Sequence, residues 1–327
     1  SERAFAYLGH WLAWALAANS GPVGKPILTR KEFELLGKAA LDACDAQDGE
    51  VDGVIGNPET CTFKPEALQC PATSDAEKSA PAHDCLTPAQ VEAAMKIYAG
   101  PRTSKGQAWS SGGSPVGSEF TWEKSLLAPA GKVPFFQFVV GNWSRYLAFE
   151  PDLPAPVTPL TGAGGPQLPA VNFDAGPAQF AATTAVAGFK PDLARFRALG
   201  GRLLIYHGWA DESLMPAHTL DYWRDARQRQ VGNPGGAQDL GEFARLFMVP
   251  GMCHCSGVIG TSSFDALTAL RDWGEKGAAP HHIPAARVLD GKTVRTRPLC
   301  PYPQVAKYQG SGGIDDAANF RCAAPLG

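Results

Sequence analysis

Residues 200–211 read GGRLLIYHGWAD, and residues 244–254 read ARLFMVPGMCH. Each stretch opens with a run of apolar residues and ends in a short loop that carries an ionisable side chain. Helical patterns lie before, between and after the two runs. Continuous apolar strands that alternate with helices indicate a parallel sheet covered on both faces. We therefore expect strands at 202–207 and 244–249 in an α/β core.

Only these two strands follow residue 190, and two are too few for a parallel sheet to stand alone. A helix over Phe264–Trp273, with Leu267 and Leu270 facing inward, is expected to cover one face of the sheet. We interpret residues 191–327 as the last strands and helices of a larger α/β core, whose remaining strands come from elsewhere.

Residues 1–190 are expected to be rich in loops, since the whole chain holds 36 glycines and 28 prolines and the stretch 103–190 has few periodic segments. Thr29 with Glu32, and Thr87 with Gln90, each have the spacing of a capping box at a helix start. The second of these helices is expected to bury Val91, Ala94, Met95 and Tyr98.

The N-terminus resembles a signal peptide, because Arg3 precedes the apolar stretch Trp11–Ala18. However, Gly9 and His10 interrupt the apolar run, and the run is too short to span a bilayer. We expect a partly buried helix here. The net charge of −3 and the lack of any Lys/Arg run give no basis for a nucleic-acid partner or a membrane partner.

The eight cysteines fall mostly into local pairs inside loop-rich sequence. No C-x-x-C spacing occurs, so disulfides are favoured over zinc, and disulfides indicate a secreted or periplasmic protein. The expected pairs are Cys44–Cys61, Cys70–Cys85 and Cys300–Cys322. Cys253 and Cys255 remain. A C-x-C disulfide is strained, so we expect each of them to bond a cysteine outside this chain. A zinc site from these two and His254 is disfavoured, because neighbouring side chains on an extended segment point in opposite directions.

Asp211 and His254 are the candidate catalytic residues. Each lies on a loop just past the carboxyl end of a strand, where functional groups of open α/β sheets gather. Asp followed by His is the order of the last two members of an α/β-hydrolase triad. A turn-forming aspartate and a core histidine are the alternative interpretation of the two residues taken singly.

The nucleophile elbow G-x-S-x-G does not occur in the sequence. Ser114 and Ser311 lie in glycine-rich stretches without a preceding strand. Ser256 is too close to His254 along the chain to serve as the nucleophile.

Three runs carry a family resemblance: 200–211, FMVPGMCHCS at 247–256, and TRPLCPYPQ at 296–304. In order and spacing they resemble the tannase and feruloyl esterase family. The resemblance implies an α/β-hydrolase fold in which residues 1–190 form a calcium-binding lid and residues 191–327 form the C-terminal part of the catalytic domain.

The resemblance also implies how the missing serine reaches the site. Asp211 and His254 would complete a triad with a serine in a Gly-Cys-Ser-x-Gly-Gly elbow, and Cys255 would bond the cysteine before that serine. The nucleophile half is absent from this chain, so an N-terminal segment or a second chain would supply both. Cys253 departs from the family pattern and suggests an additional disulfide or a free thiol.

The acidic loop DAQDGEVDGV, residues 45–54, offers oxygen ligands to a hard cation. Its spacing is not that of an EF-hand, and a solvated acidic turn is the alternative. The family carries a structural calcium ion in its lid at this motif. The match implies Ca²⁺ held by the side chains of Asp45, Asp48 and Asp52 and by the backbone carbonyls of Glu50 and Val54.

The expected substrate is a small aromatic ester of feruloyl, galloyl or terephthalate type. An aromatic cluster in the lid is a candidate pocket for its ring, and it comprises Phe135, Phe136, Phe138, Trp143 and Tyr146. The expected activity is serine-type carboxylic ester hydrolysis. A non-catalytic, calcium-stabilised module that binds phenolics and a serine peptidase of related fold are the alternatives.

Overall fold

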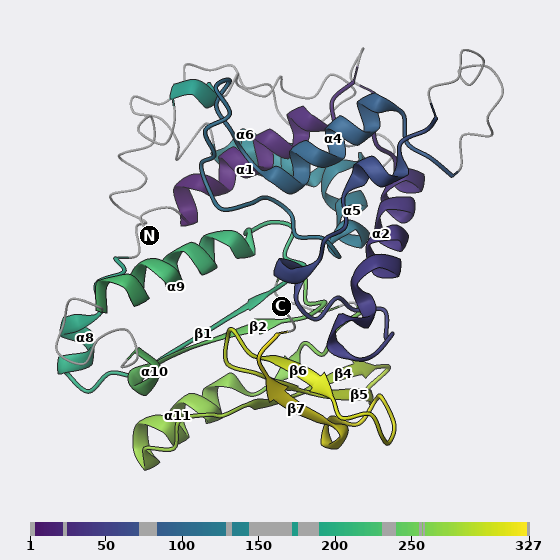
Figure 1. The fold of residues 1–327 in the computed structure, drawn as a ribbon. Coiled ribbons are helices and arrows are strands. Elements are labelled where there is room, and N and C mark those ends of the chain that lie inside the picture. The colour runs from purple at the N-terminus through teal and green to yellow at the C-terminus, as the bar shows by residue number, and fades with distance from the viewer. Residues whose placement is uncertain are drawn as a thin grey trace.

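The structure is a computed structural model. It describes residues 4–21, 25–71, 84–128, 133–143, 172–175, 190–230, 240–254, 257 and 259–325. A helical layer from the first half of the chain lies over a second layer that holds the strands (Figure 1). The helical layer contains α1 (Ala4–Ala18), α2 (Arg30–Cys44), α4 (Pro88–Ala99), α5 (Trp122–Leu126) and α6 (Phe135–Trp143).

The second layer is built around two parallel strands. Strands β1 (Leu203–Gly208) and β2 (Ala244–Val249) pair in parallel, with Leu203 opposite Ala244. Both strands predicted from the apolar runs are therefore confirmed. The helices of this layer are α8 (Ala194–Ala198), α9 (Pro216–Gln230), α10 (Leu240–Phe243) and α11 (Ala266–Lys276).

The expectation of only two strands after residue 190 was wrong. A three-stranded antiparallel sheet follows, and a two-stranded hairpin near the C-terminus follows that sheet. The additional strands are β3 (Ser263–Phe264), β4 (Ile283–Leu289), β5 (Lys292–Leu299), β6 (Val305–Tyr308) and β7 (Phe320–Ala323). Strand β2 remains parallel to β1 alone, and an isolated antiparallel bridge joins its Phe247 to Pro301.

Helix α1 confirms the buried helix predicted at the N-terminus, and the two residues that interrupt its apolar run explain how it packs. A Cβ on Gly9 would lie 2.1 Å from the ring of Trp143, so only glycine lets α6 approach this closely. His10 is buried, and its ring meets Trp109 and Trp143 edge-on at centroid distances of 4.5 and 5.3 Å. None of the described helices is both long enough and apolar enough to cross a membrane.

The two capping boxes are present. Thr29 N–H donates to Glu32 Oε2 at 2.7 Å, and Thr87 N–H donates to Gln90 Oε1 at 2.9 Å. The buried face of α4 differs from the prediction, because Met95 is 42% exposed. The residues of α4 that are buried are Val91, Ala93, Ala94 and Ile97.

Helix α11 also faces the sheet differently from the prediction. Trp273 is its buried residue, Leu270 is half-buried, and Leu267 is 77% exposed. At 3.6 residues per turn, Leu267 lies about 120° around the helix from Trp273. The inward orientation expected for Leu267 was therefore wrong.

Candidate active site

The loops that follow β1 and β2 are held together by their backbones. Trp209 N–H donates to the Val249 carbonyl at 2.9 Å, and Ala210 N–H donates to the Met252 carbonyl at 3.0 Å. A Cβ on Gly208 would lie 2.1 Å from the same Met252 oxygen, so glycine is required at this contact. This backbone pairing brings the residues that follow the two strands to one place.

Asp211 lies at that place with its carboxylate fixed on both oxygens. It is 5% exposed. Its Oδ1 accepts the backbone N–H groups of Ser213 and Leu214 at 2.9 and 2.8 Å. Its Oδ2 lies 3.2 Å from His254 Nδ1 and 3.2 Å from His207 Nε2. Burial acts to raise the pKa of Asp211, but hydrogen bonds, led by that from His207, outweigh it and hold this pKa below its ordinary value.

His254 presents one ring edge to Asp211 and the other to the outside. Its side chain is 41% exposed, in contrast to the 7% of the Asp211 side chain. Its backbone N–H donates to Glu212 Oε2 at 3.3 Å, which also ties the two loops together. The Asp–His pair that the sequence predicted is thus brought together, with Nδ1 toward the acid.

Sequence reasoning missed His207, the second imidazole on Asp211. Its Nε2 lies 2.8 Å from the Leu214 carbonyl as well as 3.2 Å from Asp211, and its Nδ1 lies 2.6 Å from Thr219 Oγ1. A carbonyl and a carboxylate only accept hydrogen bonds, so Nε2 carries the proton. A polar side chain inside the apolar run LLIYHG is the signal that could have revealed it.

The segment after Asp211 is anchored in the helical layer. Trp11 Nε1 on α1 donates to the Glu212 carbonyl at 3.0 Å. Met215 is 1% exposed and belongs to the same apolar cluster as Trp11. The helical layer therefore contributes directly to the position of the candidate acid.

The acidic loop is folded around its own aspartates. Asp45 accepts the N–H groups of Asp52 and Gly53 at 3.3 and 2.9 Å, and Asp48 Oδ1 accepts that of Glu50 at 3.2 Å. Burial raises the pKa of Asp45, and burial together with the charge of Asp52 raises the pKa of Asp48 to about 7. The charges of Asp45 and Asp52 both act on Asp48, so the three side chains lie in one neighbourhood.

Two arginines of β5, which the sequence analysis did not predict, form ion pairs with this loop. Asp52 Oδ2 lies 3.0 Å from Arg295 Nη1 and 2.7 Å from Arg297 Nη2. Within the described residues, no three His, Cys, Asp or Glu side chains are grouped so that they could hold a metal ion. The hard oxygen donors suit Ca²⁺ in type, but a cation here would share Asp52 with the arginines. Calcium binding stays a prediction.

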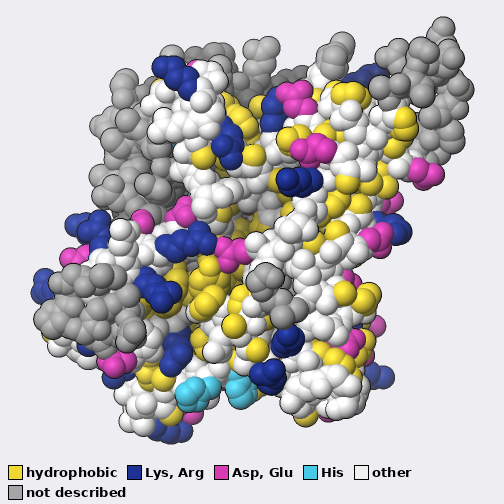
Figure 2. All heavy atoms as spheres, in the orientation of Figure 1, with side chains coloured by type: hydrophobic (Ala, Val, Ile, Leu, Met, Phe, Trp, Pro, Cys, Tyr) yellow, Lys and Arg dark blue, Asp and Glu magenta, His cyan; other side chains and the backbone are white. Residues whose placement is uncertain are grey.

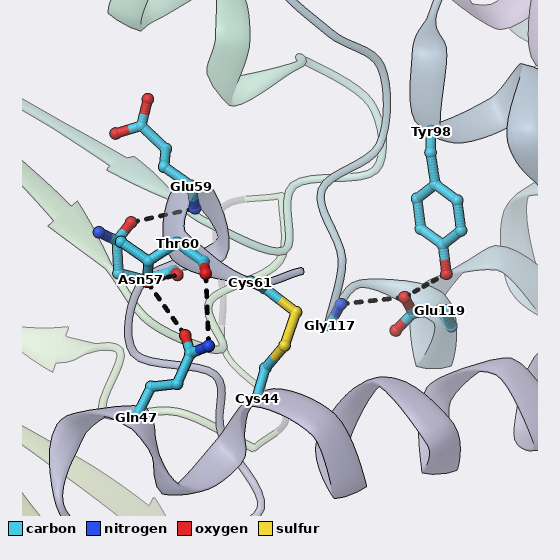
Figure 3. The surroundings of a disulfide bond; sticks show 9 residues. All are labelled: Cys44, Gln47, Asn57, Glu59, Thr60, Cys61, Tyr98, Gly117 and Glu119. Atoms are coloured by element: carbon cyan, nitrogen blue, oxygen red, sulfur yellow. Dashed lines mark hydrogen bonds between the residues drawn. A yellow bond between two sulfur atoms is a disulfide. The ribbon is translucent and has the colours of Figure 1, made fainter. Parts of the chain in front are cut away.

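The three expected disulfides are present, joining Cys44 to Cys61, Cys70 to Cys85 and Cys300 to Cys322. Figure 3 shows the first of them beside Gln47, whose side chain bonds Thr60 across the base of the acidic loop. Cys253 is buried, and Cys255 lies outside the described residues, so its predicted bond to another segment stays a prediction.

The predicted aromatic pocket maps mainly onto α6. Phe136 and Trp143 are buried, whereas Phe135 and Phe138 are about half exposed. Phe136 belongs to the core of the helical layer. Tyr146 lies outside the described residues. Substrate contact by this set stays a prediction.

Comparison with known proteins places the chain in a family. The family model described as tannase and feruloyl esterase matches residues 2–148 and 170–323. The chain is 35% identical over 354 residues to mono(2-hydroxyethyl) terephthalate hydrolase of Piscinibacter sakaiensis, covering 97% of this chain and 57% of that protein. It is 35% identical over 301 residues to a probable feruloyl esterase of Arthroderma benhamiae, covering 90% of this chain and 53% of that protein.

The fold agrees with this relationship. The structure superposes on feruloyl esterase B from Aspergillus oryzae with a TM-score of 0.76 at 23% identity, covering 98% of this chain and 61% of that one. The chain spans little more than half the length of the relatives it matches. On these matches, the chain belongs to the tannase and feruloyl esterase family.

Proposed function

We propose that this chain supplies the acid and the base of a serine carboxylic ester hydrolase that acts on aromatic esters. The observation that carries the proposal is the contact between Asp211 Oδ2 and His254 Nδ1 at 3.2 Å, on adjoining loops past the ends of two parallel strands. A buried carboxylate against one nitrogen of a part-exposed imidazole is the arrangement that activates a hydroxyl nucleophile.

The proposed roles follow from the geometry. Asp211 keeps the proton of His254 on Nδ1, so Nε2 is free of a proton and accepts the one from the attacking serine hydroxyl. His254 then returns that proton to the leaving alcohol, and the acyl group is released by water in a second, similar step. Asp211 stabilises the imidazolium formed in each step without taking the proton itself.

His207 is proposed as a positioning residue. Its Nε2–H group donates toward Asp211 and the Leu214 carbonyl, and its Nδ1 accepts from the Thr219 hydroxyl. These contacts hold Oδ2 in the direction of His254. The two backbone donors on Oδ1 prevent the carboxylate from rotating away.

The serine is proposed to come from a segment beyond this chain. Within the described residues β1 has a strand neighbour on one side only, so a further parallel strand fits on its other side. Cys255, directly after the base, is proposed to bond a cysteine of the same segment. Whether that segment is part of the same polypeptide or a separate chain stays open.

The names of the relatives support the substrate class. One is a hydrolase of a terephthalate ester, and the other is a probable feruloyl esterase. Terephthalic and ferulic acids are both aromatic acids. The carbonyl that is esterified is attached to the ring directly in the first and through a carbon–carbon double bond in the second. We propose esters of aromatic acids as substrates of the complete protein.

Hydrolysis of methyl ferulate and methyl gallate tests the proposal, using this chain together with its serine-bearing segment. His254→Ala is expected to abolish turnover, whereas the exposed Lys38→Ala, on the outer face of α2, should leave it unchanged. Equal loss in both variants, or full activity of His254→Ala, contradicts the assignment. Intact mass before and after reduction shows whether the segment is disulfide-linked to the 34.6 kDa chain.

We also propose that Ca²⁺ stabilises the acidic loop and that the protein works in an oxidising compartment, as a secreted or periplasmic enzyme. The three disulfides support the compartment. The oxygen donors of Asp45, Asp48 and Asp52, which suit Ca²⁺ in type, support the cation. Removal of calcium by EGTA should lower the thermal midpoint, and an unchanged midpoint would mean that Arg295 and Arg297 suffice.

A further inference from the structure

A cationic cleft lies on the far side of β2 from β1. Its volume is about 660 Å³, which is large enough for a small organic ligand. Arg245, Arg321, His281 and His282 line it, and among the described residues no aspartate or glutamate does. The chain as a whole carries a net charge of −3, so this concentration of positive donors is local. Figure 2 shows histidine side chains beside Lys or Arg side chains at the lower edge of the molecule, between α11 and β7.

Arg245 is the innermost cation of the cleft. Its Nε is buried and has no hydrogen-bond partner, which is costly for a charged donor. Its guanidinium lies 5.8 Å from the centroid of the buried Trp273 ring, a cation–π distance that holds the side chain in place. Burial lowers the pKa of Arg245. Arg245 lines the cleft, so an anion bound there would lie near its positive charge.

Apolar side chains line part of the cleft and are held in place. Tyr302, several prolines and Phe320 are among its lining residues. The Cys300–Cys322 disulfide joins the segments that carry Tyr302 and Phe320, and the Tyr302 N–H donates to the Leu246 carbonyl on β2 at 2.7 Å. Rigid walls of this kind reduce the entropy lost when a planar ring is bound.

The cleft is separate from the candidate active site. Arg245 is the second residue of β2, whereas His254 follows the opposite end of the same strand. At a rise of about 3.3 Å per residue, the strand between them spans about 13 Å or more. No residue of β1 lines the cleft.

We propose that this cleft binds a small aromatic carboxylate, with its carboxylate on Arg245 and the neighbouring histidines and its ring against Tyr302 and the prolines. Charge-assisted hydrogen bonds to a guanidinium supply the affinity for the anion. The apolar lining favours an aromatic ring over the hydroxyl-covered ring of an acidic sugar.

Isothermal titration with benzoate, its neutral analogue benzamide, and galacturonate tests the proposal. Benzoate is expected to bind, and benzamide should bind about 10- to 100-fold more weakly, because a charged hydrogen bond is lost. Equal binding of benzoate and benzamide, or no binding of benzoate, overturns the proposal. Binding of galacturonate in place of benzoate overturns the aromatic assignment.

Variants locate the site. Arg245→Gln should weaken benzoate binding by at least about tenfold. The double variant His281→Ala/His282→Ala, which changes two exposed histidines, should weaken it by a similar factor. This second variant keeps the assay informative if the first one misfolds. Arg271→Gln, which removes an exposed arginine paired with Asp272, is the matched control. If His254→Ala reduces benzoate binding and the cleft variants leave it intact, benzoate binds at the catalytic site and the proposal is overturned. No ester is used, so the result is independent of the proposed hydrolysis.

Discussion

Removal of the Cys44–Cys61 disulfide should destabilise the protein and weaken any calcium effect on the acidic loop. The two cysteines are 17 residues apart, and closing a loop of this length removes about 3 kcal/mol of unfolded-state entropy. Cys44 is 1% exposed and packs against Ala40 and Ile55. Replacing it with alanine leaves a small void that costs about 1 kcal/mol more. We therefore expect Cys44→Ala/Cys61→Ala to lose about 4 kcal/mol of unfolding free energy.

The second disulfide provides the control. Cys70 and Cys85 are 15 residues apart, so chain entropy alone predicts a similar loss of about 3 kcal/mol for Cys70→Ala/Cys85→Ala. Both of these cysteines are only half-buried. This pair does not enclose the acidic loop.

Urea unfolding at neutral pH, with Ca²⁺ and with EGTA, separates the two contributions. The stabilisation by Ca²⁺ should shrink in the first double variant, because the ends of the loop at 44 and 61 are no longer joined. It should persist in the second. If both variants lose the same free energy and keep the same calcium effect, the disulfide does not organise the loop and the reasoning is refuted.

Three further predictions concern buried ionisable groups. Burial raises the pKa of Glu119 despite hydrogen bonds that include that of the Tyr98 hydroxyl, so the stability that its protonated carboxyl contributes is lost as the pH rises from the unfolded pKa of about 4.3 through the folded one. Glu119→Gln should therefore gain stability relative to wild type in urea titrations as the pH rises above about 4.3, and a constant difference would contradict this. The lowered pKa of Asp211 acts in the opposite direction. The stability that its carboxylate contributes is present above about pH 3.9 and is lost as the pH falls through the folded pKa. The stability deficit of Asp211→Asn should therefore narrow on acidification, and a deficit that widened would argue against the shift. His207→Ala should lower kcat/KM about 30-fold, equivalent to about 2 kcal/mol for one buried charged hydrogen bond. It should also move the acidic limb of the pH–activity profile to higher pH, because Asp211 loses a donor that competes with His254. A fall in activity with an unmoved limb would mean that His207 has only a structural role.

The sequence identifies features that local chemistry determines. Runs of apolar residues defined β1 and β2 within one residue, and cap residues such as Thr29 and Thr87 marked helix starts. The rule that functional groups follow strand ends in open sheets is enough to identify Asp211 and His254 from the sequence. Cysteines close in sequence predicted the three disulfides.

Features that depend on distant segments were not predictable in this way. Strands β5 and β7, KTVRTRPL and FRCA, are half-exposed and rich in charge, so neither has an apolar run or a clear alternation. The pairing of Asp52 with Arg297 joins residues 245 positions apart, and no local pattern encodes it. Leu267 was misplaced because a helical period shows that one face is apolar without fixing which residue lies at its centre.

The open side of β1 also has a practical consequence for handling the chain. Within the part of the chain that the structure describes, one edge of β1 is unpaired and its Tyr206 is 51% exposed. An unpaired strand edge with apolar side chains is a template for joining another copy. With a net charge of only −3, electrostatic repulsion between molecules is weak. The apparent molar mass of the isolated polypeptide, measured by light scattering, should therefore grow with concentration. Dilute, cold stock solutions should limit this association.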